Sequence, residues 1–512
     1  MKNTPNRANS GVSSNPWNQT HNYLDGLIAC ELQDNVFTDV DGFLKFFNHI
    51  SIDQEIYTTR STMTEFEAWM ECTNKSTIKF EMKGRHWFNL LSNLAQHPSR
   101  FFYGSGDYPL GDAHHEAVRK CDIFLSRTLS DEEDQMAINP PANNRVKDEN
   151  MVKHSWKHVL VPGEFKYNSR EDCSQRILIQ LAGYVREVYG AQPGRMFVHA
   201  FTVCGSIVRF WLFDRASVSI SKAYNILEKP NKSLLVRALL GYTMMSAGQL
   251  GFDERYKDVS FEPFITSKNT PLPTYFHLGT NHFRLNKLMY SAPSIISRGT
   301  LCWEAKHEVT GATCVVKDAW KSKSRPSEAE FWNTAKQKGV LSCMKIVAYE
   351  DAEEVSWDES NINNLRRNLN PTTAKLFLGP NNVAPVFNHS ITQSRKPSAE
   401  MQSAPLEDNI FTAPQRDAIP MVSSGRKRKL LATDPPYPIS KRSNVIDINT
   451  NDRDRTHHYL ITGNLGNQLR DDTPARQLLE ALRDAIKCTP SYPFFFIYSP
   501  TDINIYRPQV LI

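Results

Sequence analysis

The stretch Ile296-Ser-Arg-Gly-Thr-Leu-Cys-Trp-Glu-Ala305, followed by Thr313-Cys-Val-Val-Lys317, decides the fold of the second half of this chain. Gly299 predicts a turn between two strands, because glycine reaches backbone conformations that other residues avoid. Thr310-Gly311 predicts a second, tight turn. The stretch therefore predicts three successive strands of an antiparallel sheet, with Lys317 on the third strand.

The turn and the lysine together suit an anionic ligand. A glycine turn lets backbone N–H groups approach phosphate oxygens, and a lysine on the third strand adds a positive charge. We expect Ser297, Arg298, Gly299 and Thr300 to form this turn. The next helix opens at Ser327-Glu-Ala-Glu330, and we expect an ion pair between Lys317 and Glu330. The alternative is a plain three-stranded sheet with an exposed lysine at a strand end.

Several longer motifs carry a resemblance to a known family. They are, in chain order, Trp156-Lys-His-Val-Leu-Val-Pro-Gly-Glu-Phe-Lys166, Gln180-Leu-Ala-Gly-Tyr184, Phe201-Thr-Val-Cys-Gly-Ser-x-Val-Arg-x-Trp211, Arg298-Gly-Thr-x-x-Trp303, Val315-Val-Lys-Asp-x-Trp320, Ala329-Glu-Phe-Trp-Asn-Thr-Ala335 and Lys338-Gly-Val340. In this order they resemble the fungal-type protein kinase family. The resemblance covers residues 156–349 and resumes over 455–487.

The resemblance implies phosphorylation of serine or threonine with ATP and Mg²⁺ as cofactors. It makes Lys317 the ATP-anchoring lysine and Glu330 its partner, and it makes residues 297–300 the phosphate-contacting turn. It also implies that residues 456–469 are the strand and hinge that touch adenine. Residues 478–487 would begin the helix that precedes the catalytic loop.

Two departures from the family pattern stand out. Ser297-Arg-Gly299 replaces a Gly-x-Gly turn, and no His-Arg-Asp or Asp-Phe-Gly motif follows Lys317. We therefore expect a truncated kinase or pseudokinase, catalytically incomplete, in which ATP binding is weak or lost. Residues 489–512 do not resemble the family.

A second group of residues predicts a different chemistry in the first half. Asp122, then Glu164-x-Lys166 at a strand end, then Gln180 on the following helix resemble a restriction-endonuclease-like core. In such a core Asp122 and Glu164 would hold Mg²⁺, and Lys166 would help to activate water for attack on a phosphodiester. The alternatives are a surface ion pair with Asp122 as a solvated cap, and an inactive module that binds nucleic acid or a partner protein.

The fold class expected from these patterns is α+β. We predict a disordered segment at 1–18, an α/β domain with a nuclease-like candidate core at 19–260, and the kinase-like small lobe at 275–351. A disordered basic insert follows at 352–454, because its composition buries too little apolar area to order itself. We place the hinge strand and the first large-lobe helix at 455–488, and a tail at 489–512.

The composition of the chain limits the classes of protein to which it can belong. The 512 residues carry a formal net charge of +5 and nine cysteines without a Cys-x-x-Cys pair. No apolar run is long enough to cross a membrane, and the first residues lack a secretory signal, so we expect an intracellular protein of the nucleus or cytoplasm. The run Arg426, Lys427, Arg428 and Lys429 predicts contact with a nuclear import receptor. A nuclear scaffold that acts by partner binding is therefore a third hypothesis.

Overall fold

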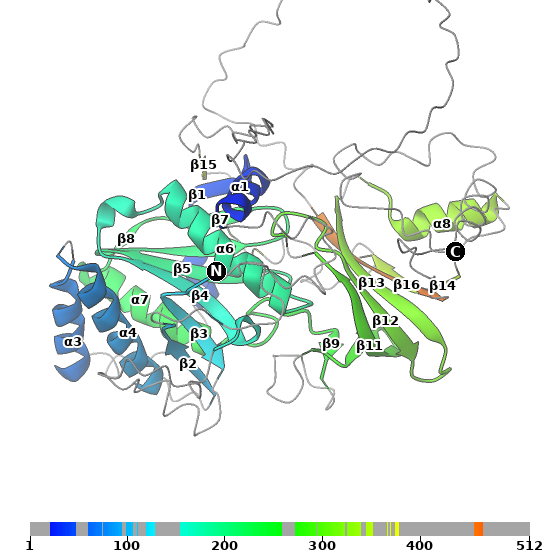
Figure 1. Ribbon diagram of the computed structural model, residues 1–512, viewed down its shortest axis with the longest axis horizontal. Coiled ribbons are helices and arrows are strands. Elements are labelled where there is room, and N and C mark those ends of the chain that lie inside the picture. The colour runs from blue at the N-terminus through cyan, green and yellow to red at the C-terminus, as the bar shows by residue number, and fades with distance from the viewer. Residues whose placement is uncertain are drawn as a thin grey trace, which may run out of the picture. The chain divides into compact units, whose positions relative to one another are not determined.

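The computed structural model contains two β-sheets and their covering helices, which are drawn in Figure 1. It describes residues 21–47, 60–73, 75–94, 99–105, 110, 119–127, 154–258, 272–292, 294–322, 325–338, 345–351, 366, 369, 374–377 and 455–463. Within this part of the chain, no helix combines the length and the apolar character needed to span a membrane.

The first sheet has the strand order β15-β1-β7-β6-β5-β4-β3-β2, with β8 paired to β6. The strands are β1 Val36–Val40, β2 Arg100–Tyr103, β3 Ile123–Arg127, β4 Val159–Lys166, β5 Val198–Cys204, β6 Ile207–Phe213, β7 Val218–Ser221, β8 Tyr224–Asn225 and β15 Lys375–Leu376. β4 runs parallel to β5 and β1 parallel to β7, and the other pairs are antiparallel. The sheet is therefore mixed.

Helices cover both faces of this sheet. They are α1 His21–Leu32, η2 Phe43–Phe47, α3 Arg60–Met70, α4 Thr77–Leu94, η3 Trp156–His158, η4 Ser169–Glu171, α6 Gln175–Ala191 and α7 Lys229–Met244. α1 contacts α6, and α4 contacts both α3 and α7. Since side chains alternate along a strand, Phe165 of β4 points to the α3–α4 face and meets Trp69 at 5.6 Å between ring centroids. Its neighbours Glu164 and Lys166 point to the α6 face.

The second sheet has the order β14-β16-β13-β12-β11-β10-β9, and every neighbouring pair is antiparallel. Its strands are β9 Tyr256–Lys257, β10 Tyr275–Leu278, β11 Asn281–Ser291, β12 Leu301–His307, β13 Thr313–Ser322, β14 Ile346–Asp351 and β16 Arg455–Gly463. Helix α8, Glu328–Gln337, connects β13 to β14. Figure 1 shows α8 beside the side of the sheet that is formed by β13, β16 and β14.

The second and third strands predicted from the opening stretch are confirmed as β12 and β13. The first is misplaced, because residues 294–300 form a loop and the preceding strand, β11, ends at Ser291. Gly299 has a φ of 51° and Gly311 a φ of 67°, the left-handed backbone that glycine adopts without strain. The helix α8 after β13 and the strand β16 at Arg455–Gly463 are elements that the resemblance implies for a kinase small lobe.

Two predicted boundaries need correction. The second sheet begins at Tyr256, within the range assigned to the first domain, because β9 pairs with β10. Lys375 and Leu376, inside the insert predicted at 352–454, form a strand that pairs with Thr38 and Phe37 of β1. The segments at 1–18 and 489–512 and the helix at 478–487 lie outside the described residues, as does most of the insert.

Candidate functional site

The candidate nucleotide site is built around Lys317 on β13. Its Nζ lies 2.7 Å from both Oε1 and Oε2 of Glu328, so one carboxylate holds the ammonium with two charge-assisted bonds. Arg298, in the loop between β11 and β12, donates from Nη2 to Oε1 of the same carboxylate at 2.6 Å. Glu328 therefore ties the glycine turn to the third strand.

The predicted pair between Lys317 and Glu330 is wrong. Glu330 accepts from the backbone N–H of Ser327 at 3.0 Å, and its own N–H donates to Ser327 Oγ at 3.1 Å. This reciprocal capping box uses the Glu330 side chain at the start of α8. Glu328, two residues earlier, is left to face Lys317.

The pair shifts the titration of Glu328. Burial by itself raises the pKa of this carboxyl, but Lys317 and Arg298 outweigh burial and lower the pKa to about 2. Desolvation of the neighbouring Cys302, which is half-buried, raises the pKa of its thiol to about 11. The site at neutral pH thus holds an ionised Glu328, which keeps Lys317 in one place.

Acid unfolding tests this ion pair. The folded pKa of Glu328 is depressed below its ordinary value of 4.5, so the pair contributes stability above pH 4.5 that is lost as the pH falls toward 2. Between pH 4.5 and 2 the parent is expected to lose up to about 3 kcal/mol of unfolding free energy through this pair, a figure that solvent screening reduces. Glu328→Gln lacks the titrating carboxyl, so its unfolding free energy should depend less on pH in this range. Chemical denaturation at a series of pH values measures the slope. An unchanged slope would contradict the pairing.

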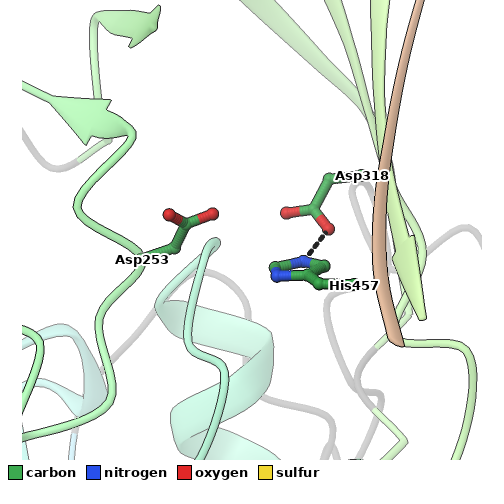
Figure 2. A group of neighbouring side chains, drawn as sticks. All are labelled: Asp253, Asp318 and His457. Carbon is green, nitrogen blue, oxygen red and sulfur yellow. Dashed lines mark hydrogen bonds and ion pairs between the residues drawn. The ribbon is translucent and has the colours of Figure 1, made fainter. Parts of the chain in front are cut away.

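The opposite face of the second sheet holds a buried polar network that sequence reasoning missed. Among the described residues, Asp253, Asp318 and His457 place their ligand atoms within 4.8 Å of one another. His457 Nε2 lies 2.6 Å from Asp318 Oδ1, and Asp253 faces the pair across the gap in Figure 2. Tyr459 Oη fills that gap, at 2.6 Å from Asp253 Oδ2 and 2.7 Å from His457 Nδ1.

The contacts of this network favour shared protons over a metal ion. Each atom that could bind a metal already has a hydrogen-bond partner, and Tyr256 Oη also donates to Asp318 Oδ2 at 3.0 Å. The chain from Asp318 through His457 and Tyr459 to Asp253 has three hydrogen bonds and needs three protons. The network links β13 and β16 to the segment before β9.

The first sheet assembles the other predicted group. Glu164 is fully buried on β4, with Oε1 bonded to Lys166 Nζ and Oε2 accepting from Tyr184 Oη at 2.8 Å. Gln180 Nε2 donates to Tyr184 Oη at 2.9 Å. Asp122 precedes β3, and its Oδ2 accepts from the backbone N–H of Phe165 at 3.1 Å.

The electrostatics of this group follow from burial. Desolvation and the nearby charge of Asp122 raise the pKa of Glu164 well above its ordinary value. The two carboxylates raise the pKa of Lys166 against the opposing effect of its burial. Glu164 and Asp122 therefore interact across the β3–β4 pair, and Lys166 offsets part of their charge. The alternative of a surface ion pair is wrong, because Glu164 has no exposed surface.

Comparison with known proteins gives one finding. A family model described as fungal protein kinase matches residues 137–491. This chain belongs to the fungal protein kinase family. No curated protein and no solved structure matches it. The family match includes β4, α6 and the whole of the second sheet, so Glu164 and Lys166 lie inside it and Asp122 outside.

The remaining predicted site residues lie either in the loop before β12 or outside the described residues. Ser297, Arg298, Gly299 and Thr300 lie in the loop between β11 and β12, as the resemblance implies. The hinge beyond Gly463 and the basic run from Arg426 to Lys429 lie outside the described residues.

Proposed function

We propose that this fungal protein kinase binds Mg·ATP through its small lobe, with Lys317 as the cation that contacts the phosphates. The observation that carries the proposal is the two-bonded ion pair between Lys317 and Glu328, on the third strand of a sheet with kinase-like order. Phosphoryl transfer depends on positioning and on neutralising phosphate charge, so a lysine held in place is the part that binding needs first.

We further propose that this chain binds ATP without transferring its phosphate. The support is in the sequence, which has no His-Arg-Asp or Asp-Phe-Gly motif after Lys317. In kinases these motifs supply the catalytic base and a ligand to Mg²⁺. Ser297 in place of a glycine also narrows the backbone conformations of the phosphate turn.

A thermal-shift titration of the full chain with Mg·ATP tests binding. A ligand at 100 times its Kd stabilises the folded state by about 2.7 kcal/mol, which raises the Tm by several degrees. Radiolabel transfer from ATP to the chain itself or to a general protein substrate tests catalysis in the same samples. The absence of a thermal shift at millimolar Mg·ATP would contradict the binding proposal. Transfer of labelled phosphate would contradict the proposal that the chain is catalytically incomplete.

A second candidate is metal-dependent hydrolysis of a phosphodiester at Asp122, Glu164 and Lys166. The observation that favours it is that Asp122, just before β3, bonds the backbone of the neighbouring strand β4, which carries Glu164 and Lys166 on the face that α6 covers. Carboxylate oxygens suit Mg²⁺, which would polarise the phosphate, and Lys166 would stabilise charge on the attacking water. To bind Mg²⁺, the buried carboxyl group of Glu164 must give up either its bond to Lys166 or a bound proton.

The nuclease-like candidate is tested by Glu164→Ala. We expect Mn²⁺-dependent cleavage of a DNA oligonucleotide to fall by at least about a hundredfold, because the metal loses a carboxylate ligand. Binding of Mn²⁺ alone, followed by calorimetry, should weaken in parallel. Glu171→Gln removes a carboxyl five residues after Lys166 and serves as the matched control. Cleavage that survives in Glu164→Ala, or an absence of cleavage and metal binding in the parent, would reject this candidate.

A further inference from the structure

The loop from Ser294 to Thr300 is the element that would contact ATP phosphates under the proposed function, and two of its backbone donors, at Ile296 and Gly299, already bond acceptors of the protein. The N–H of Ile296 donates to Glu31 Oε1 at 2.6 Å. The N–H of Gly299 donates to Ser297 Oγ at 3.0 Å, and Ser297 Oγ lies 2.7 Å from Ser294 Oγ. A phosphate oxygen that approaches either of these two N–H groups must therefore replace an acceptor of the protein itself.

The acceptor at Ile296 is a carboxylate from helix α1, far away in the sequence. Arg186 of α6 pairs with the other carboxylate oxygen of Glu31, and its Nη1 lies 3.4 Å from Oε2. The Glu31 side chain is only 14% exposed, and the neighbouring Ile295 is fully buried in the core that α1 and α6 share. The negative charge of Glu31 thus lies against amide donors of the kind that bind phosphate.

A second contact holds the same loop. Arg215, which is 3% exposed, donates from Nη1 to the carbonyl oxygen of Ser294 at 2.6 Å. Its guanidinium also lies 3.6 Å from the ring centroid of Tyr189. A Cβ on Gly299 would lie 2.8 Å from Arg215 Nε, so glycine is needed here for close approach of the arginine as well as for the turn. The loop is therefore clamped at Ser294, Ile296 and Gly299.

We propose that Glu31 acts as an internal anion that occupies the phosphate-binding amides of the loop and so lowers the affinity for ATP. The inference rests on the proposed ATP binding. ATP then binds with its full affinity only when the loop leaves α1. Glu31 is a competitor of the phosphates, and Arg215 is a positioning residue that keeps the loop within reach of Glu31.

The test compares Glu31→Ala and Glu31→Gln with the parent chain at pH 8, because burial raises the pKa of Glu31. The control is Asp25→Ala, which removes another arginine-paired carboxylate from α1, bonded to Arg119 at 2.8 Å. Two quantities are measured on each full chain: Mg·ATP affinity by titration, and hydrogen exchange of the peptide that spans residues 294–300. We expect Glu31→Ala to speed amide exchange at Ile296 and to tighten Mg·ATP binding about tenfold or more. Glu31→Gln should show a smaller change in the same direction, and Asp25→Ala should show neither.

The possible failures are separable. Unchanged exchange in both Glu31 variants would show that the clamp does not hold the loop, and would overturn the inference. Faster exchange with equal or weaker ATP binding would overturn the competition while leaving the ATP site intact. If neither the parent nor the variants bind Mg·ATP, the proposed function itself fails and the inference fails with it.

Discussion

Lys317→Ala is expected to lower the affinity for Mg·ATP by at least about a hundredfold. The side chain brings a positive charge to the phosphates from a strand position, and its two bonds to Glu328 hold it there before the ligand arrives. A charge-assisted contact of this kind contributes about 1.5–3 kcal/mol, and loss of the cation also leaves Glu328 to repel the phosphates. Calorimetric titration, or the thermal shift where affinity is low, measures the change.

The two glutamates at the start of α8 provide a matched comparison for that result. Glu328→Ala should weaken Mg·ATP binding about tenfold, because Lys317 and Arg298 lose the carboxylate that positions them. Glu330→Ala should leave the affinity nearly unchanged and cost about 1 kcal/mol of helix stability, because this side chain is part of the capping box. If Glu330→Ala weakens binding and Glu328→Ala does not, the assignment of the ion pair is wrong.

Asp318→Ala is expected to destabilise the folded chain by about 3–5 kcal/mol. Asp318 is 3% exposed, shares a hydrogen bond with His457 Nε2 and accepts from Tyr256 Oη, so its removal leaves both groups buried without that partner. The network ties β16 to β13 and to the segment before β9, and β16 follows a long insert in the sequence. Loss of the tie should therefore loosen β16 before the first sheet unfolds.

Denaturant titration followed by tryptophan fluorescence measures this effect, because Trp320 stacks on His457 with ring centroids 4.1 Å apart. Tyr256→Phe is the control. It removes only the bond of 3.0 Å to Asp318 and should cost about 1 kcal/mol. Equal costs for the two variants would show that the carboxylate of Asp318 contributes no more than one ordinary hydrogen bond.

Much of the small lobe could be predicted from local pattern. The turns at Gly299 and Thr310-Gly311 separate three strands, and the capping sequence from Ser327 to Glu330 begins a helix. The same capping sequence held the signal that was overlooked. A serine followed three residues later by glutamate predicts a reciprocal cap, which should have pointed to Glu328 as the partner of Lys317.

The nuclease-like group shows how much of a site the spacing of residues in the sequence can predict. Glu164 and Lys166 were expected at the end of a strand, and because they alternate with Phe165 they lie on one face of β4, beside Tyr184. Tyr184 was named only as part of the motif Gln180-Leu-Ala-Gly-Tyr184 and was given no role at the site. Its hydroxyl contacts Glu164 because α6 crosses that face of β4, and the angle of that crossing is not encoded in the spacing.

The sequence by itself determined the local elements of this protein, the family to which it belongs and the strand that carries Lys317, because turns, caps and alternation depend on neighbouring residues. Only the tertiary structure decided the contacts between distant segments. Asp318 meets His457 across 139 residues, Glu31 meets Ile296 across 265, and Thr38 meets Lys375 across 337. Those contacts depend on which faces bury apolar area together, a free energy that belongs to the whole fold and to no single stretch of the chain.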